Sequence, residues 1–574
     1  HDGLPAILLK FDAHEKDFEH KAVDVVIRDI MNDIPGLVES DRLIERLLAI
    51  IKNYNNRGLD DAIGTNAQRA DKNTFFLDEL SDLETAKLAP FLGSKAKNLI
   101  YLRNSGFNVP PGVVLSSLYT NRNKEYMESP EFVSILKRIV KHLEDKTGAI
   151  FGSGRKPLFL SVRSGSYISM PGILSSILYC GMNNRTFKAL EKNTGNPMLA
   201  RDAYRRFLEH YATVVFGLDP IIFESIMNSF MAQKGGAKHD KHGSEQLQHI
   251  IRLYLEELTR RGLSIPEDVY EQLRMSIRAV YASWQGTRAT SYRRAVAMSG
   301  HWGTAVTLMQ MVYGNEAGSG ASVFFTRHPL SYERNVYGET REESTGDDIV
   351  SGKQNSRPLA RSQSRNDQHS LEETDPKLFT LHQDFAKKIE DAMGGLPQEV
   401  ELAYIRGRRG KRILFALQSR RMDFGGNNIR TFSEICRMES RIIGRGIGAH
   451  GGALSGIASF ASSIEQVMQL RKKTLMPIIL LRKTANTDDV TLMPVVRGII
   501  TASGGVTSHA AMLAQKFDVT TVLMCSSLVL NTTEQGEPYA TLGDVVIKEG
   551  TLISMDGASG LIFSGMCLNT TAVF

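Results

Sequence analysis

The chain has 574 residues, too many for one hydrophobic core, and we expect roughly three domains of about 100–200 residues each. Hydrophobic residues make up 42% and charged residues 23%, which is typical of an ordinary globular protein and not of a disordered one. The net charge of +6 is small for this length, and no dense Lys/Arg run is interleaved with aromatic residues, which argues against nucleic-acid binding.

The predicted elements change character along the chain. Over residues 1–84 apolar positions recur at helical spacing, so we predict an N-terminal helical extension whose default role is packing or docking of a partner. From residue 85 the pattern becomes mixed α/β, with a strand predicted at 157–162 and helices at 203–215 and 269–284.

Polar stretches and glycines divide the rest of the chain. The stretches 233–246 and 344–376 have the composition of loops, and the second is long enough to be partly disordered. We predict one domain over 85–423, a linker over 424–443, and a compact Gly- and β-rich domain over 444–574. The predicted fold class is therefore α/β (α+β).

Two basic residues stand in settings typical of phosphate binding. Lys95, in the segment Phe91–Leu99, would supply a mobile point charge, and a solvated surface lysine is the alternative. A predicted strand delivers Arg163 into a Ser/Gly-rich loop, where its guanidinium and backbone N–H groups could meet phosphate oxygens. The alternative for Arg163 is a salt bridge at a strand edge. Met311, at the end of another predicted strand, is by itself no more than a core residue.

Alternating side chains indicate two more strands that carry polar groups. Glu401 lies in one of them, and Gln418 and Arg420 lie in the other. A carboxylate and an amide supply the oxygen ligands that Mg²⁺ prefers when it bridges nucleotide phosphates. Strand-end side chains that face water are the alternative.

One histidine near the C-terminus follows a run of small residues. Gly504 and Gly505 allow a bulky group to approach the backbone, and Thr507 or Ser508 can cap the helix predicted after His509. Free N–H groups at a helix start favour an anion, so the imidazole is well placed to accept a phosphoryl group. A histidine without chemistry in a capping region is the alternative.

Read together, these segments resemble the pyruvate phosphate dikinase family, within the wider group that includes phosphoenolpyruvate synthase. The resemblance covers about residues 90–565. Its strongest match in the N-terminal half is Leu160–Gly172, which ends in Ser169-Met170-Pro171-Gly172, the dikinase form of the motif. It implies an ATP-grasp nucleotide-binding domain followed by a swivelling β/β/α phosphohistidine domain.

The resemblance also implies residue roles. Six residues would contact Mg²⁺·ATP, with Glu401 and Gln418 binding the metal and Met311 lining the adenine: Lys95, Arg163, Met311, Glu401, Gln418 and Arg420. His509 would carry the phosphoryl group between two active sites, and Thr507 matches a position of regulatory phosphorylation in some members. Residues 515–520 depart from the family, because they have Gln-Lys-Phe-Asp-Val-Thr where its pattern is Arg-Gly…Gly-x-Pro.

The implied reactants are ATP and AMP, phosphate and diphosphate, with Mg²⁺ as the cofactor. Pyruvate or phosphoenolpyruvate would bind only to a third domain, a β/α barrel of roughly 250 residues, which we expect to be missing from this chain. A homodimer is one assembly that the family allows. The four cysteines lack C-x-x-C spacing, which argues against a disulfide framework or a zinc site and indicates a reducing compartment.

No segment approaches eighteen uninterrupted apolar residues, so we expect no membrane span. The expected location is the cytoplasm, or an organelle if a transit segment has been removed.

Three functional interpretations stay open. The first is a dikinase that performs the nucleotide half of the conversion of pyruvate, ATP and phosphate into phosphoenolpyruvate, AMP and diphosphate. The second is a synthase-like dikinase that uses water or another acceptor. The third is a degenerate, non-catalytic ATP-binding module, which the motif substitutions Ser94, Ala96, Ser175, Gln515 and Thr520 would explain.

Overall fold

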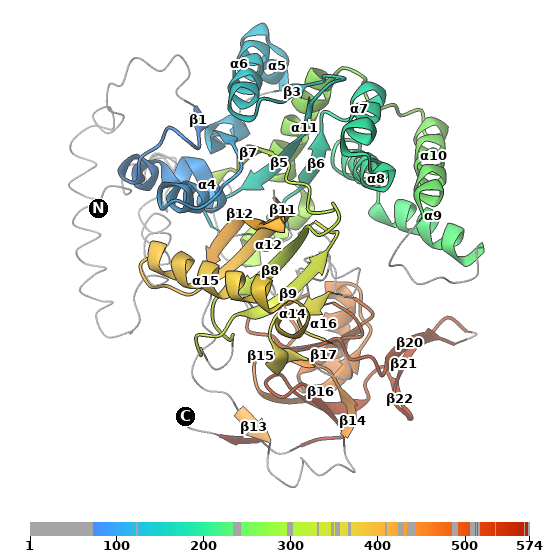
Figure 1. Ribbon diagram of the computed structural model, residues 1–574. Helices are drawn as coiled ribbons and strands as arrows, with labels where there is room; N and C mark the ends of the chain where they lie inside the picture. The colour runs from blue at the N-terminus through green and yellow to red at the C-terminus, as the bar shows by residue number, and fades with distance from the viewer. Residues whose placement is uncertain are drawn as a thin grey trace, which may run out of the picture. The chain divides into compact units, whose positions relative to one another are not determined.

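The computed structural model describes residues 73–571 with internal gaps (Figure 1). The residues outside the described ranges are 1–72, 122–123, 169, 171–172, 234–242, 296–301, 330–331, 346–348, 350–355, 365–368, 408–409, 423–429, 433–441, 485–488, 490–491, 505–510, 512–513, 515–516, 534, 568 and 572–574. Most of the predicted N-terminal extension therefore lies outside them. The described residues form two compact units, of which the first includes Leu174–Val312 and the second Tyr313–Phe574.

An antiparallel sheet forms the centre of unit 1. Its strands follow the order β1 (Thr74–Phe76), β2 (Gly112–Leu115), β7 (Ala305–Gln310), β5 (Leu160–Gly165) and β6 (Ser176–Cys180). Strand β1 lies inside the segment predicted as a helical extension, so residues 74–76 correct that prediction: they belong to the sheet. The strand predicted at 157–162 is confirmed as β4 (Pro157–Leu158) followed by β5.

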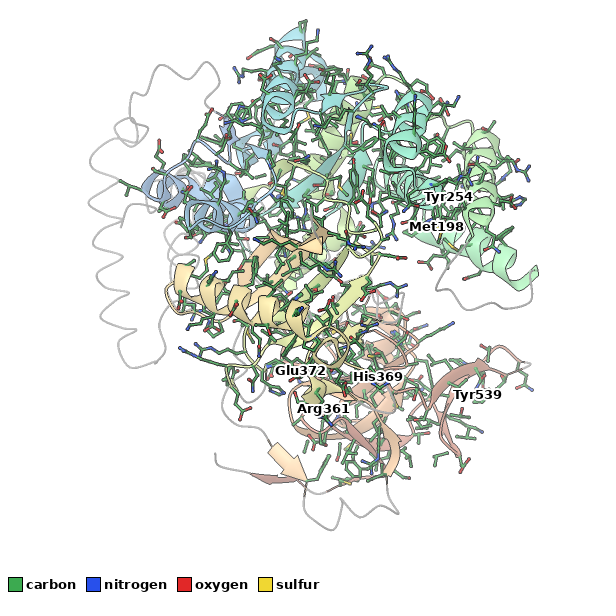
Figure 2. All side chains as sticks on the ribbon, in the orientation of Figure 1. Met198, Tyr254, Arg361, His369, Glu372 and Tyr539 are labelled. Atoms are coloured by element: carbon green, nitrogen blue, oxygen red, sulfur yellow. The ribbon has the colours of Figure 1, made fainter. Side chains whose placement is uncertain are left out.

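Helices surround this sheet. They are α4 (Asp82–Asn104), α5 (Lys124–Glu128), α6 (Pro130–Thr147), α7 (Asn184–Thr194), α8 (Pro197–Val214), α9 (Pro220–Gln233), α10 (Ser244–Arg260), α11 (Val269–Ser283) and α12 (Thr287–Ala295). The predicted helices are confirmed as α8 and α11, which pack on β6 and β5 with their apolar faces. Tyr254 of α10, labelled in Figure 2, is buried and donates to the Phe223 carbonyl of α9.

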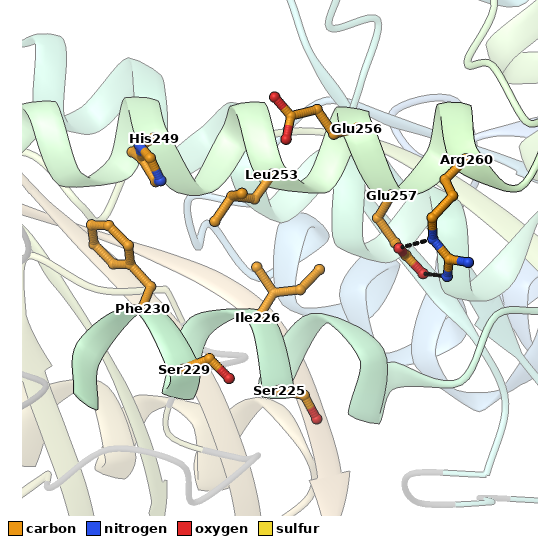
Figure 3. Close-up of a pocket in the computed structure, with 9 residues that line it drawn as sticks. All are labelled: Ser225, Ile226, Ser229, Phe230, His249, Leu253, Glu256, Glu257 and Arg260. Atoms are coloured by element: carbon orange, nitrogen blue, oxygen red, sulfur yellow. Dashed lines mark hydrogen bonds and ion pairs between the residues drawn. The ribbon is translucent and has the colours of Figure 1, made fainter. Parts of the chain in front are cut away.

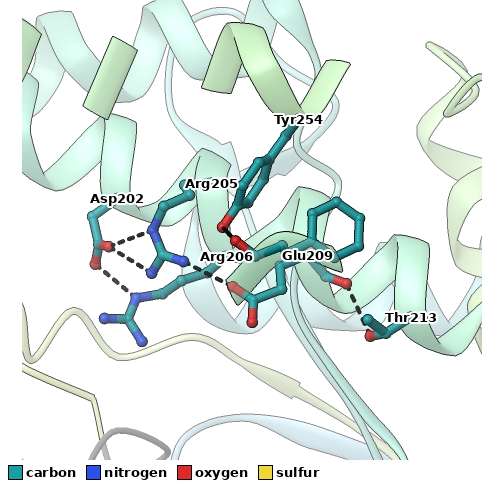
Figure 4. Close-up of polar contacts among 7 residues, drawn as sticks. Asp202, Arg205, Arg206, Glu209, Thr213 and Tyr254 are labelled. Atoms are coloured by element: carbon teal, nitrogen blue, oxygen red, sulfur yellow. Dashed lines mark hydrogen bonds and ion pairs between the residues drawn. The ribbon is translucent and has the colours of Figure 1, made fainter. Parts of the chain in front are cut away.

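A cluster of charges joins successive turns of α8 (Figure 4). Asp202 Oδ1 accepts from Arg205 Nη2 at 3.0 Å, Asp202 Oδ2 accepts from Arg206 Nε at 2.7 Å, and Glu209 Oε2 accepts from Arg205 Nη1 at 2.8 Å. Burial disfavours the Asp202 carboxylate, but the charges of Arg206 and Arg205 outweigh burial and lower its pKa to about 2. Asp202 is therefore ionised at all physiological pH values.

Unit 2 contains a second antiparallel sheet. Its order is β10 (Arg357–Pro358), β9 (Tyr337–Glu342), β8 (Gly320–Phe325), β11 (Gln398–Arg406) and β12 (Arg412–Arg421). Helix α15 (Pro376–Ala392) packs on this sheet through the buried His382, whose Nε2 lies 2.8 Å from Ser322 Oγ. The stretch 344–376, predicted as a loop, contains β10 and α14 (Leu371–Thr374), which corrects the prediction for these residues.

The C-terminal part of unit 2 has a mixed eight-stranded sheet. Its order is β14 (Ile442–Arg445), β24 (Leu561–Ser564), β23 (Leu552–Asp556), β16 (Ala453–Ser459), β17 (Ile478–Arg482), β18 (Gly498–Thr501), β19 (Thr520–Leu523) and β15 (Ile447–His450). Strands β16 to β19 are parallel, and α16 (Ile464–Lys473) connects β16 to β17. A smaller sheet, β20 (Leu528–Thr532), β21 (Pro538–Leu542) and β22 (Val545–Lys548), carries Tyr539 (Figure 2).

The predicted linker 424–443 lies partly outside the described residues. Its described residues form strand β13 (Arg430–Phe432), which pairs with β25 (Asn569–Thr571), and the start of β14. Phe432 packs against Ala453 and Phe563 of the C-terminal sheet and against Cys567, which follows β24. Phe432 is therefore part of the apolar packing of that sheet.

Three of the four cysteines lie in the described part of the chain. Cys180, Cys525 and Cys567 are free and buried, and burial raises the pKa of Cys180 to about 12. Across the residues that the structure describes, no helix combines the length and the apolar character needed to cross a membrane.

Candidate functional site

A kink in α4 brings Lys95 next to the end of β5. Gly93 interrupts the helix at φ +79°, and a Cβ at this position would lie 2.2 Å from the Gly165 carbonyl oxygen. A glycine is therefore required here both for the left-handed backbone and for the close approach. Ser94 donates to the Ser166 carbonyl from its N–H (3.0 Å) and from its hydroxyl (3.1 Å). The Lys95 Cβ lies 3.9 Å from where a Cβ of Gly165 would be.

Arg163 and Met311 lie on adjoining strands of the same sheet. Arg163 of β5 is opposite Thr307 of β7, and the N–H of Met311 donates to the Phe159 carbonyl at 3.0 Å just beyond β7. Four residues along a strand separate the two positions, which is about 13 Å. Unit 1 thus places Lys95 and Arg163 near one end of β5 and Met311 near the other.

The β11–β12 ladder brings the three predicted residues of unit 2 together. Glu401 is directly opposite Gln418, and Glu399 is directly opposite Arg420. Positions two apart on a strand share a face, so all four side chains project from one face of the ladder. The bulge after Glu401 marks the end of this regular register. The two strands predicted from alternation are confirmed here.

Sequence reasoning missed Glu399, which engages Arg420. The Glu399 side chain is 5% exposed, and its Oε2 accepts from Arg420 Nε at 2.9 Å and from Nη2 at 2.6 Å. Both bonds go to one oxygen, and they fix the plane of the guanidinium. The alternating pattern that predicted the strand could have revealed this residue, because Glu399 precedes Glu401 by two positions and so lies on the same face.

The side chains of the ladder fit a hard cation that is held mainly by the phosphate oxygens of a bound nucleotide and only partly by the protein. Among the described residues, no group of three or more His, Cys, Asp or Glu side chains could hold a metal ion. Glu401 and Gln418 supply one carboxylate and one amide oxygen at opposed positions of the ladder. Mg²⁺ in nucleotide enzymes is commonly held by one or two such side chains together with phosphate oxygens.

His509 and Thr507 lie outside the described residues. Around them the structure describes the carboxyl end of β18, Ser503, Ala511 and Ala514, and the last two are helical as predicted. The Ser503 hydroxyl lies 2.6 Å from that of Thr484 and donates to the Lys483 carbonyl, which joins the segments after β17 and β18. His328, half-buried against the Tyr337 ring at 4.6 Å, has its pKa lowered by burial, and nothing in the structure assigns it a role.

A groove between α9 and α10 contains none of the predicted residues (Figure 3). It has a volume of about 520 Å³, and Phe230, Ile226 and Leu253 form its apolar floor. The Glu257–Arg260 ion pair lies at one end. This lining offers no cluster of phosphate-binding groups, so we regard the β5 end of unit 1 and the β11–β12 ladder of unit 2, each by itself, as the candidate functional regions.

The chain is similar to two family models and to several known proteins. Residues 119–374 match the family model described as "Pyruvate phosphate dikinase, AMP/ATP-binding domain", and residues 476–560 match "PEP-utilising enzyme, mobile domain". The pyruvate, phosphate dikinase of Rhizobium meliloti is 32% identical over 508 residues, which cover 83% of this chain and 56% of that protein. That of Rickettsia felis is 33% identical (84% and 56%), and the chloroplastic protein of Mesembryanthemum crystallinum is 31% identical (83% and 51%). The chain spans about half the length of these relatives.

Proposed function

Because the chain belongs to the pyruvate, phosphate dikinase family, we propose that it performs the nucleotide half of the dikinase reaction. In this half-reaction the β-phosphoryl group of ATP is transferred to His509 and the γ-phosphoryl group to orthophosphate. The products are phosphohistidine, AMP and diphosphate. The observation that carries the proposal is the β11–β12 ladder, which presents Glu399, Glu401, Gln418 and Arg420 on one face.

The roles follow from charge. Splitting a triphosphate develops negative charge on the transferred group and the leaving group, and fixed cations lower that cost. Arg163 and Arg420 would bind phosphate oxygens with planar guanidinium groups, and Lys95 would follow the group in transfer with its flexible ammonium. Glu399 would hold the Arg420 guanidinium in one orientation, as the two hydrogen bonds between them suggest.

Glu401 and Gln418 would bind Mg²⁺ together with the phosphates. Held by these two side chains, Mg²⁺ would supply positive charge that offsets the negative charge of the phosphates. At the other end of β5, backbone groups around Met311 would receive the adenine base. Transfer from His509 to pyruvate would require a pyruvate-binding site, and we propose the complete conversion only for a protein that supplies one.

Labelling with β-³²P-ATP tests the proposal. With Mg²⁺ and phosphate, the wild-type chain should acquire acid-labile, base-stable label, and His509→Ala should abolish it. His369→Ala is the matched control, because His369 is an exposed histidine of unit 2 (Figure 2) and its loss should leave the label unchanged. Equal label on wild type and His509→Ala would refute the mechanism.

Omitting phosphate separates the two dikinase types. Label that requires orthophosphate supports the pyruvate, phosphate dikinase reaction, whereas label formed equally without it supports the synthase-like alternative. Tight ATP binding without any phosphohistidine supports the non-catalytic module.

A further inference from the structure

A threonine directly after β8 joins three parts of unit 2. Thr326 is 5% exposed, and its N–H donates to the Gln398 carbonyl at 2.8 Å. Its hydroxyl donates to Glu390 Oε1 of α15 at 2.7 Å and accepts from the Gln398 N–H at 2.9 Å. The backbone of Gln398, at the start of β11, is therefore bonded to Thr326 through both its N–H and its carbonyl.

The carboxylate of Glu390 determines which way the Thr326 hydroxyl points. Paired with Arg327, this carboxylate only accepts hydrogen bonds, so the hydroxyl hydrogen is directed to it and a lone pair is left for the Gln398 N–H. Arg327 donates to the two Glu390 oxygens from Nε and Nη2, each at 3.0 Å. The Glu390 side chain is 8% exposed, and the forked contact fixes its plane.

Gln398 also binds the neighbouring strand. The Ser419 hydroxyl of β12 donates to Gln398 Oε1 at 2.9 Å, and Gln398 is 2% exposed. Glu399 is the next residue after Gln398. Arg420, which is directly opposite Glu399, is the next residue after Ser419. Successive side chains of a strand point to opposite faces, so the bond between Ser419 and Gln398 lies on one face of the ladder and the Glu399–Arg420 pair on the other.

We propose that Thr326 is a positioning residue for Arg420. Bound to Glu390, it fixes the start of β11 and with it the Glu399 carboxylate that orients the Arg420 guanidinium. Thr326 acts through Gln398 and Glu399 and needs no contact with the nucleotide. The inference rests on that part of the proposed function in which Arg420 binds a nucleotide phosphate.

Binding of Mg²⁺ and a non-hydrolysable ATP analogue to the full chain tests this role. Thr326→Val keeps a similar shape but removes the hydroxyl, so the Gln398 N–H and the Glu390 carboxylate both lose that partner. We expect it to speed exchange of the Gln398 amide and to weaken binding about tenfold, the usual effect of losing one buried hydrogen bond. Thr326→Ser, which retains the hydroxyl, should restore both.

Two further variants separate positioning from a general loss of stability. Because Thr326 acts through Arg420, Thr326→Val should cause no further loss of affinity in an Arg420→Ala background. Thr340→Val is the matched control in the same sheet. The buried Thr340 hydroxyl donates to the Ala321 carbonyl at 3.0 Å and accepts from Ser322 Oγ at 2.8 Å. This variant should lose similar hydrogen bonds and still bind the analogue like the wild type.

The outcomes distinguish the inference from the proposed function. Wild-type affinity in Thr326→Val, the same weakening with and without Arg420, or the same weakening in Thr340→Val overturns the role of Thr326 while the wild type continues to bind and to take label on His509. A wild type that binds the analogue but takes no label overturns the proposed transfer and leaves the role of Thr326 supported. A wild type that does not bind the analogue overturns both.

Discussion

At the scale of single residues, the presentation of Arg420 depends on the carboxylate of Glu399. The pair is mostly buried, and both of its hydrogen bonds run to one carboxylate oxygen. A buried ion pair is costly to break from one side, because the remaining charge stays without compensation. The same carboxylate therefore affects both the stability of unit 2 and the geometry of the proposed phosphate site.

The variant Glu399→Ala separates these effects. We expect it to lower the free energy of unfolding by about 3 kcal/mol in urea titrations and to slow His509 labelling at saturating ATP. Glu342→Ala is the control, since Glu342 and Arg357 form an exposed pair 3.7 Å apart in the same sheet. Its unfolding free energy should change by less than about 1 kcal/mol. Equal effects of the two variants would show that the pairing is unimportant.

At the scale of elements, the kink in α4 determines where Lys95 lies. Gly93→Ala should be strongly destabilising, because the new Cβ would need a left-handed backbone and would clash with the Gly165 carbonyl. Gly106→Ala shares the positive φ, at +87°, but has no atom within 4 Å of the added Cβ.

Both variants place an alanine at a positive φ, so the difference in their stability measures the clash of the Gly93→Ala methyl group with the Gly165 carbonyl. Gly106→Ala should cost about 1 kcal/mol of unfolding free energy, and Gly93→Ala clearly more, with weaker ATP binding as well. Titration calorimetry with ATP and urea unfolding would measure both. Similar losses in the two variants would mean that α4 adapts without displacing Lys95.

The charge cluster on α8 makes a prediction about pH. The pKa of Asp202 is lowered from 3.8 to about 2, so the stabilisation it provides is present above about pH 4 and disappears as the pH falls towards 2. Asp202→Asn should therefore lose about 2 kcal/mol at pH 6, and its gap to the wild type should shrink at lower pH. Asp145→Asn, which alters an exposed pair with Lys141, should leave the free energy of unfolding nearly unchanged. A gap for Asp202→Asn that is constant between pH 6 and 3 would contradict the assignment.

At the scale of the whole molecule, the proposed nucleotide contacts are divided between the two units. Arg163 belongs to unit 1 and Arg420 to unit 2. A nucleotide present at about 100 times its Kd should stabilise the folded chain by about 2.7 kcal/mol. Calorimetry with Mg²⁺ and a non-hydrolysable ATP analogue should show the unfolding temperature rising, and Arg163→Ala or Arg420→Ala should each reduce the rise. Arg357→Ala should not.

Local patterns predicted the elements that are long or strictly periodic. Helices α8 and α11 and strands β11 and β12 carry their apolar positions at regular spacing, so the sequence alone located them. Strands β1 and β10 have three and two residues, too few for a period, and they exist because distant strands pair with them. Element identity at such places is decided by tertiary contacts.

The candidate site residues were likewise predictable only in part from local sequence patterns. The alternation of polar residues predicted that Glu401 and Gln418 lie on strands, but only the register shows that they face each other. His509 and Thr507 remain predictions.

Strand β13 pairs with β25, so the two ends of the segment 430–571 lie side by side. A segment whose two ends are adjacent can be inserted into a surface loop of another protein without stretching either junction. Inserting residues 430–571 into such a loop would show whether the β13–β25 ladder and the packing of Phe432 are sufficient for this segment to fold on its own.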